Sequence, residues 1–235
     1  MIEIIPFASL GHADHGWLDA RHHFSFANYH DPDRMGVGPL RVWNDDRIAP
    51  NSGFPMHPHR DMEIITYVRS GAITHEDQLG NHGRTEAGDV QVMSAGTGIA
   101  HSEFNHESED TTLFQIWIMP NAARVAPRWE QRRFPKDRDA GGLTPLASGR
   151  EADLAEGALM IHQDATVFGG TLAKGAAIEQ ALGAGRLGYL VVARGSVTVN
   201  GTKLETRDGA RIADTNRLTI AADEEAEILL ADLPR

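Results

Sequence analysis

Cysteine is absent from the 235-residue chain, and its absence excludes both disulfide bonds and thiolate metal ligands. No stretch approaches 18 consecutive uncharged apolar residues, so we expect no membrane-spanning helix. The N-terminus, MIEIIPFASLGHADHG, contains acidic residues and a proline but no basic segment followed by an apolar one. It therefore lacks the pattern of a secretion signal, and we expect a cytoplasmic protein.

Positive charge is scarce, because 22 Lys and Arg residues stand against 33 Asp and Glu residues, giving a formal net charge of −11. Such a surface repels nucleic-acid phosphates and anionic membranes, so we expect neither as a direct partner. A protein partner remains possible. The oligomeric state is open, with a monomer favoured. Apolar residues make up 41% of the chain, enough for the core of one large β domain or two small ones.

Helical periodicity is also nearly missing from the sequence. Short apolar or alternating runs recur instead, separated by turn signals, as in a β sandwich or barrel. The Asn200-Gly201 pair predicts a hairpin, because both central residues of a type I′ turn need positive φ. Residues 153–157 favour one short helical turn, and 128–133 fit either a helix or a strand. The expected strands cover 40–43, 62–68, 90–93, 113–119, 188–193, 196–199, 217–221 and 226–230.

The middle of the chain carries the signals of a domain boundary. Pro120, Pro127 and Pro135 interrupt it, and a charged run covers 130–139. A weak repeat supports two halves, because 65–89 and 189–209 both read as strand, glycine, strand, loop, glycine turn and strand. We therefore predict an N-terminal domain of residues 1–125 and a C-terminal domain of residues 126–235.

Histidine is abundant, with 12 residues. A single histidine is most often an ordinary surface or core residue, but His57 with His59 and His101 with Glu103 form two pairs of metal-competent side chains. Residues two apart in a strand point to the same face, about 6.6 Å apart, and neighbouring strands lie about 4.8 Å apart. The two pairs therefore predict a metal site of three imidazoles and one carboxylate.

The glycine frame around these pairs is informative as well. The spacings Gly53-x3-His57-x-His59-x3-Glu63-x7-Gly71 and Gly88-x9-Gly98-x2-His101-x3-Asn105 resemble the two motifs of cupins. We expect Gly96 and Gly98 to allow a tight bend that brings His101 back over the strand of His57 and His59.

The stretches 88–103, 16–19, 24–29 and 57–63 are similar to the pirin family, and within it to bacterial members described as quercetin 2,3-dioxygenases. The resemblance is strong over 11–135 and weaker but collinear to the C-terminus. It implies an all-β bicupin with two antiparallel β-barrel or jelly-roll domains. No histidine occupies the matching positions of the second half, so we expect a degenerate C-terminal domain without metal ligands.

The fourth ligand has two candidates. In an unbroken strand Glu63 would lie about 13 Å from His59, too far to share an ion. Glu103 lies on the same face as His101, and pirins likewise use the carboxylate at this position. We therefore predict His57, His59, His101 and Glu103 as ligands and Glu103 as the catalytic residue. Glu63 is either a residue that orients an imidazole or a buried polar residue satisfied by the backbone.

Other residues near the motifs have less specific expectations. His75 and His82 could reach the mouth of a pocket, and we favour solvent exposure for both. Asn105 occupies the cupin asparagine position, and we favour a turn-capping role. We expect Phe24 and Phe26 to fill the core rather than to stack on a ligand.

A site of imidazoles and a carboxylate without thiolate suits several divalent metals. Fe(II) fits O₂ chemistry, and the resemblance also implies iron, with Ni, Cu, Mn and Zn left open. The resemblance implies a dioxygenase that opens the central ring of a flavonol such as quercetin, with Glu103 taking the proton of the 3-hydroxyl. The alternatives are an iron-dependent redox-sensing module that binds a protein partner, and a metal-free β scaffold.

Overall fold

The structure is a computed structural model of the chain, and it describes residues 1–134 and 142–235. Strands dominate this part, accompanied by the short helix α1 (Glu151–Ala155) and the 3-10 turn η1 (Phe7–Ser9). Pro135 and much of the charged run 130–139 lie outside the described residues. Within the described part, no helix combines the length and apolar character needed to cross a membrane.

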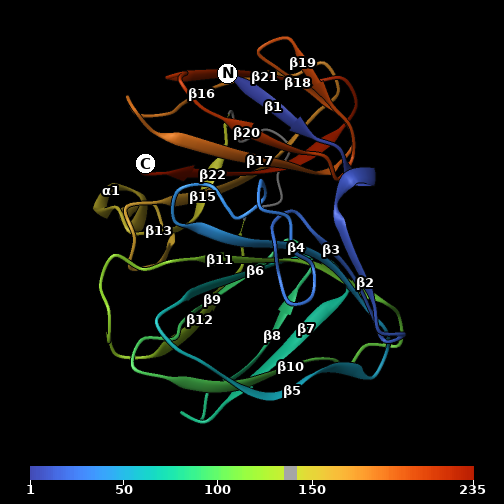
Figure 1. Cartoon of the computed structure of the whole chain (residues 1–235), viewed down its shortest axis with the longest axis vertical. Helices are drawn as coiled ribbons and strands as arrows, with labels where there is room; N and C mark the ends of the chain where they lie inside the picture. Colours follow the sequence, from blue (N-terminus) through green and yellow to red (C-terminus); the bar gives the residue numbers. More distant parts are fainter. Residues whose placement is uncertain (135–141) are drawn as a thin grey trace.

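Two antiparallel sheets form the N-terminal domain (Figure 1). The larger sheet has the order β12-β9-β6-β11-β4-β3-β2, and its strands are β2 (Gly11–Asp14), β3 (Leu18–His22), β4 (Leu40–Ile48), β6 (Glu63–Ser70), β9 (Val90–Ser94), β11 (Thr111–Ile118) and β12 (Arg128–Arg132). The smaller sheet has the order β5-β10-β7-β8, and its strands are β5 (Ser52–His59), β7 (Ala72–Asp77), β8 (His82–Glu86) and β10 (Ile99–Asn105).

The C-terminal domain repeats this plan. Its larger sheet has the order β1-β20-β17-β22-β15-β13-β14, with β1 (Ile2–Ile5), β13 (Thr144–Ser148), β14 (Leu159–Met160), β15 (Thr166–Leu172), β17 (Leu187–Arg194), β20 (Gly209–Ile212) and β22 (Ala226–Leu233). Its smaller sheet has the order β16-β21-β18-β19, with β16 (Ala177–Ala181), β18 (Val197–Val199), β19 (Thr202–Leu204) and β21 (Arg217–Ala222). The architecture confirms the predicted all-β bicupin.

Two strands pair outside their own half of the sequence. The N-terminal strand β1 pairs with β20 of the C-terminal domain. The strand β12, at the segment that could have been helix or strand, pairs with β9 of the N-terminal domain. Each domain thus contributes an edge strand to the larger sheet of the other.

The two larger sheets face each other at the centre of the molecule (Figure 1). Trp43 and Phe114 from one domain share an apolar cluster with Tyr189 and Leu229 from the other, and the rings of Trp43 and Tyr189 lie 5.6 Å apart. The buried imidazole of His23 meets the Tyr189 hydroxyl at 2.8 Å in the same layer. This shared core fixes the two domains against each other.

The strand β4 shows how alternation divides the two faces of the larger sheet. Asp45 points to the domain interface, where it is fully buried and pairs with Arg69 and Arg207. Its neighbours Asn44 and Asp46 point the opposite way, because successive side chains in a strand alternate. Both therefore line the interior of the N-terminal domain.

The expected hairpin at Asn200-Gly201 is confirmed. Asn200 has φ +46° and Gly201 has φ +83°, and Val199 pairs with Thr202 on either side of the turn. The helical turn expected at 153–157 is also present, beginning slightly earlier as α1.

Candidate metal centre

The two predicted pairs meet on neighbouring strands. β5 and β10 run antiparallel with His57 directly opposite His101. The turn before β10 needs glycine, because Gly96 has φ +46° and Gly98 has φ +137°. A Cβ on Gly96 would also lie 2.0 Å from the Val125 carbonyl oxygen. The predicted bend is therefore confirmed.

The three imidazoles form one group. One ring nitrogen of each of His57, His59 and His101 lies within 4.8 Å of the others. The ring centroids of His57 and His101 are 4.5 Å apart, and those of His57 and His59 are 4.8 Å apart. A divalent ion ligated at about 2.1 Å by each nitrogen requires separations below this limit.

Hydrogen bonds select which nitrogen His57 offers. Its Nδ1 lies 2.8 Å from the Pro55 carbonyl oxygen, which can only accept. His57 therefore donates through Nδ1–H, and its Nε2 keeps a lone pair. A backbone carbonyl that fixes the tautomer in this way is a usual companion of a ligating histidine.

A second set of contacts does the same for His101. The Asp77 carboxylate lies 3.0 Å from His75 Nε2, and His75 Nδ1 lies 3.3 Å from His101 Nδ1. Because an ionised carboxylate only accepts, His75 donates through Nε2–H and accepts at Nδ1 from His101 Nδ1–H. His101 Nε2 is then left with a lone pair, and it is buried without a partner in the described chain.

His75 itself contradicts its expected exposure. It is fully buried and stacks on Trp129, with centroids 4.7 Å apart and planes 8° apart. Burial alone would raise the pKa of Asp77, but hydrogen bonds from His75 and Asn81 lower it below its usual value. Sequence spacing missed this role because His75 reaches His101 only through the pairing of β7 with β10. His82, by contrast, is exposed as expected.

Burial keeps two of the clustered imidazoles neutral. Burial first, and then the positive charge of the neighbouring histidines, lowers the pKa of His59 to about 4 and that of His101 to about 3. Both are unprotonated at pH 7. Neutral imidazole is the form that ligates metal, so the donor set fits a divalent ion.

Glu103 lies in the same cavity, buried to 3% exposure, but outside the group of three imidazoles within the described residues. Its Oε1 accepts a hydrogen bond of 2.6 Å from the Gln91 amide, and its Oε2 accepts one of 3.0 Å from the Gln115 amide. The Thr66 hydroxyl lies 3.3 Å from Oε1. The role of Glu103 as a fourth ligand stays a prediction.

The partners of Glu103 belong to a polar row across the larger sheet. Register places Asn44 opposite both His22 and Gln115, Gln115 opposite Thr66, and Thr66 opposite Gln91. The row consists of His22, Asn44, Gln115, Thr66 and Gln91. The sequence alone shows only a polar residue at an inner position of each strand. The row could not be predicted, because the register between the strands is what brings these residues side by side.

Glu63 does not reach the cluster. β5 ends at His59 and β6 begins at Glu63 in the other sheet, with Asp61 at φ +46° between them. The strand is thus broken, contrary to the unbroken strand assumed above. The buried carboxylate of Glu63 accepts from Ser94 Oγ at 2.7 Å and lies 3.2 Å from His162 Nδ1 of the C-terminal domain. It is a buried polar residue held by side chains, at the domain contact.

Asn105 caps a turn, as expected. Its side-chain amide donates to the carbonyl oxygens of Ile48 and Glu109 at 2.9 and 2.8 Å, and its carbonyl oxygen accepts from the backbone N–H of Glu107.

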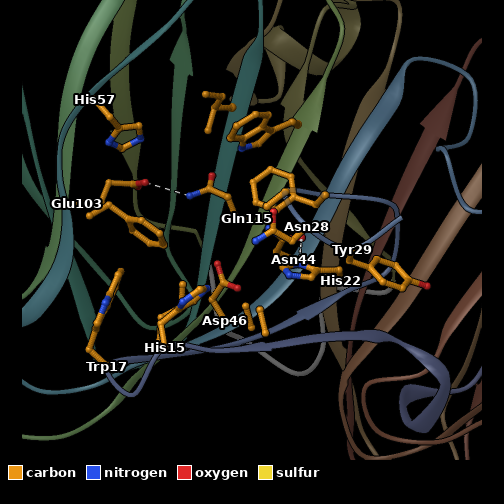
Figure 2. A pocket seen from close by; sticks show the side chains of 18 of the residues that line it. His15, Trp17, His22, Asn28, Tyr29, Asn44, Asp46, His57, Glu103 and Gln115 are labelled. Atoms are coloured by element: carbon orange, nitrogen blue, oxygen red, sulfur yellow. Dashed lines mark hydrogen bonds between the residues drawn. The ribbon is translucent and has the colours of Figure 1, made fainter. Parts of the chain in front are cut away.

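A cavity of about 610 Å³ opens on the cluster (Figure 2). Phe24 fills the core as expected. Phe26 instead lines the cavity and meets Trp117 edge-on, with ring centroids 5.5 Å apart, so the core position expected for Phe26 was wrong.

Among the described residues, the metal-competent side chains that cluster are His57, His59 and His101, all in the N-terminal domain. The aromatic wall of the cavity is made by Trp17, Phe26, Tyr29, Phe54 and Trp117.

Comparisons with known proteins agree with this arrangement. Residues 6–118 match the family model described as Pirin, and residues 146–233 match that of the quercetinase C-terminal cupin domain. The chain is 59% identical to a pirin-like protein of Caulobacter vibrioides, over 99% of each chain. It is 48% identical to a quercetin 2,3-dioxygenase of Escherichia coli, over 95% of each.

Solved structures extend the similarity to three dimensions. The structure of YhhW from Escherichia coli has a TM-score of 0.94 and 46% identity, covering 100% of this chain and 98% of that one. A structure of the bacterial pirin YhhW in complex with nickel(II) has a TM-score of 0.93 and 46% identity, covering 100% and 99%. With its fold, its histidine cluster and these relatives, the chain belongs to the pirin family.

Proposed function

We propose that this protein is a metal-dependent dioxygenase that opens the central ring of flavonols such as quercetin with O₂, with loss of carbon monoxide. The observation that carries the proposal is that the three clustered histidines and the buried Glu103 line the same cavity as the aromatic side chains. The names of related proteins support the same reaction class.

His57, His59 and His101 would hold one divalent ion, with Glu103 proposed as a fourth ligand. We favour Fe(II), and the nickel(II) complex of a relative supports a divalent site without fixing the metal. The ion would acidify the flavonol hydroxyl and hold the reactants adjacent.

Glu103 would receive the proton of the flavonol 3-hydroxyl. Its two oxygens are already aimed by Gln91 and Gln115, so little reorganisation is needed when the substrate arrives. The aromatic wall would stack the flat ring system and exclude water from it. Ring opening inserts both atoms of one O₂ and releases one carbon monoxide, so atoms balance without a further reductant.

The test is aerobic incubation with quercetin of protein loaded separately with Fe(II), Ni(II), Mn(II), Cu(II) or Zn(II). Loss of the visible flavonol absorption together with carbon monoxide release is expected for at least one metal. Variants Glu103→Gln and His57→Ala should lose turnover, while His82→Ala, an exposed histidine outside the cavity, should retain it.

Two results would overturn the proposal. One is the absence of carbon monoxide with every metal tested, which would favour the redox-sensing alternative. The other is unimpaired ring opening by the Glu103→Gln variant, which would remove the carboxylate from the reaction.

A further inference from the structure

One carboxylate in the cavity is unused by the proposed chemistry. Asp46 lies on β4, opposite Ala20 of β3 and Leu113 of β11. Neither neighbour has a polar side chain, so nothing in the adjacent register positions can hydrogen-bond to it. Its position differs from that of Asn44 on the same face, whose Oδ1 meets His22 Nδ1 at 2.8 Å.

One oxygen of the buried Asp46 carboxyl group is unsatisfied. Its side chain is 3% exposed, and its Oδ1 finds no hydrogen-bond partner among the described residues. The residue lines the cavity, and Figure 2 shows its carboxyl group pointing toward the middle of that space, across from His57 and Glu103. A buried polar atom without a partner is costly and therefore calls for an explanation, and a functional role is one of them.

The surroundings of Asp46 also favour the protonated form of its carboxyl group. Burial first, and then the negative charges of Asp45 and Glu103, raises the pKa of Asp46 well above its usual value. A neutral carboxylic acid can donate one hydrogen bond and accept others. A hydroxyl group matches this pattern, whereas an anionic ligand group would be repelled by Glu103.

We propose that Asp46 is a specificity-determining residue that holds a second hydroxyl group of a polyhydroxylated aromatic substrate, across the cavity from the metal. This inference rests on the proposed function, because that function determines how the substrate is oriented, with its 3-hydroxyl group at the histidine cluster. A site built to hydrogen-bond a substrate hydroxyl discriminates against analogues that lack it, because its own polar group is then left unpaired.

The test measures anaerobic binding to the Ni(II)-loaded protein of two probes, quercetin and 3-hydroxyflavone. The second keeps the 3-hydroxyl and the neighbouring carbonyl but lacks the other ring hydroxyls. We expect wild type to favour quercetin, and Asp46→Leu to reduce the ratio of the two dissociation constants by roughly 5- to 10-fold, the value of one buried hydrogen bond. Asp46→Asn, which still donates and accepts, should keep most of the preference.

Equal affinity of wild type for the two probes would overturn the inference without any variant. So would an unchanged ratio in Asp46→Leu, or a ratio that Asp46→Asn loses as fully as Asp46→Leu. Binding without O₂ is independent of ring opening. Carbon monoxide release with no probe preference would therefore refute the Asp46 subsite alone, and a preference dependent on Asp46 with no carbon monoxide would refute the dioxygenase alone.

Discussion

The side-chain amide of Gln91 donates a hydrogen bond of 2.6 Å to the Glu103 carboxylate, and this bond joins the two sheets of the N-terminal domain. Gln91 lies on β9 of the larger sheet, and Glu103 lies on β10 of the smaller one. A buried carboxylate is thus held from the opposite sheet. Among the described residues, its hydrogen bonds come from amide and hydroxyl groups and not from a cationic side chain.

The Gln91–Glu103 bond predicts a coupled loss of stability. Gln91→Ala should lower the free energy of unfolding by about 2–3 kcal/mol, because it removes a hydrogen bond to a charged group and leaves that group buried. Urea unfolding of the metal-free protein measures the loss, with Gln180→Ala, at a partly exposed position of the C-terminal domain, as the control. In a double-mutant cycle with Glu103→Ala the two losses should not add. Additive losses would show that the bond contributes nothing.

The contact between His75 and His101 predicts a change in metal affinity. His75→Ala or Asp77→Asn should weaken binding of Ni(II) by about 10- to 100-fold, because the tautomer and orientation of His101 are no longer fixed. Competition with a chromophoric chelator gives the dissociation constants. His82→Ala, on the neighbouring strand and exposed, should bind as wild type does. Unchanged Ni(II) affinity in both the His75 and the Asp77 variants would contradict the proposed role of the Asp77–His75–His101 contacts.

Removal of metal should lower thermal stability. A ligand that binds only the folded state at 100 times its dissociation constant stabilises by about 2.7 kcal/mol, so chelator treatment should reduce Tm by several degrees and added Ni(II) should restore it. Calorimetry of the His101→Ala variant should show no metal-dependent shift in Tm. A full shift in that variant would place the ion elsewhere.

The buried His23 predicts acid sensitivity at the domain interface. Burial first, and then the positive charges of Arg34 and Arg207, lowers the pKa of His23 to about 3. The unfolded chain titrates near 6.5 and therefore binds more protons below that pH. The contribution of neutral His23 is complete above pH 6.5 and is lost as the pH falls toward 3, by up to about 1.4 kcal/mol per pH unit.

Urea unfolding at several pH values, with a chelator present, checks this expectation. The stability of wild type relative to His23→Gln should decline on acidification within that window. A difference that stays constant from pH 7 to pH 4 would show that His23 does not titrate on unfolding.

The sequence predicted the fold class and the three clustered histidines for a simple physical reason. Strand alternation and glycine turns are local properties, so the two-residue spacing of His57 and His59 already placed them on one face. Gly96 and Gly98 predicted a tight bend, because glycine readily adopts the positive φ that such a bend needs. The C-terminal hairpin at Asn200-Gly201 followed from the same kind of local rule.

Tertiary structure decided what depends on register between distant strands. His75 was expected at the surface, yet the pairing of β7 with β10 buries it against His101. Gln91 meets Glu103, and Oδ1 of Asp46 has no hydrogen-bond partner among the described residues, because particular strands face each other across the domain. A single sequence states which side chains share a face of one strand, but contacts between sheets arise only when the whole chain closes.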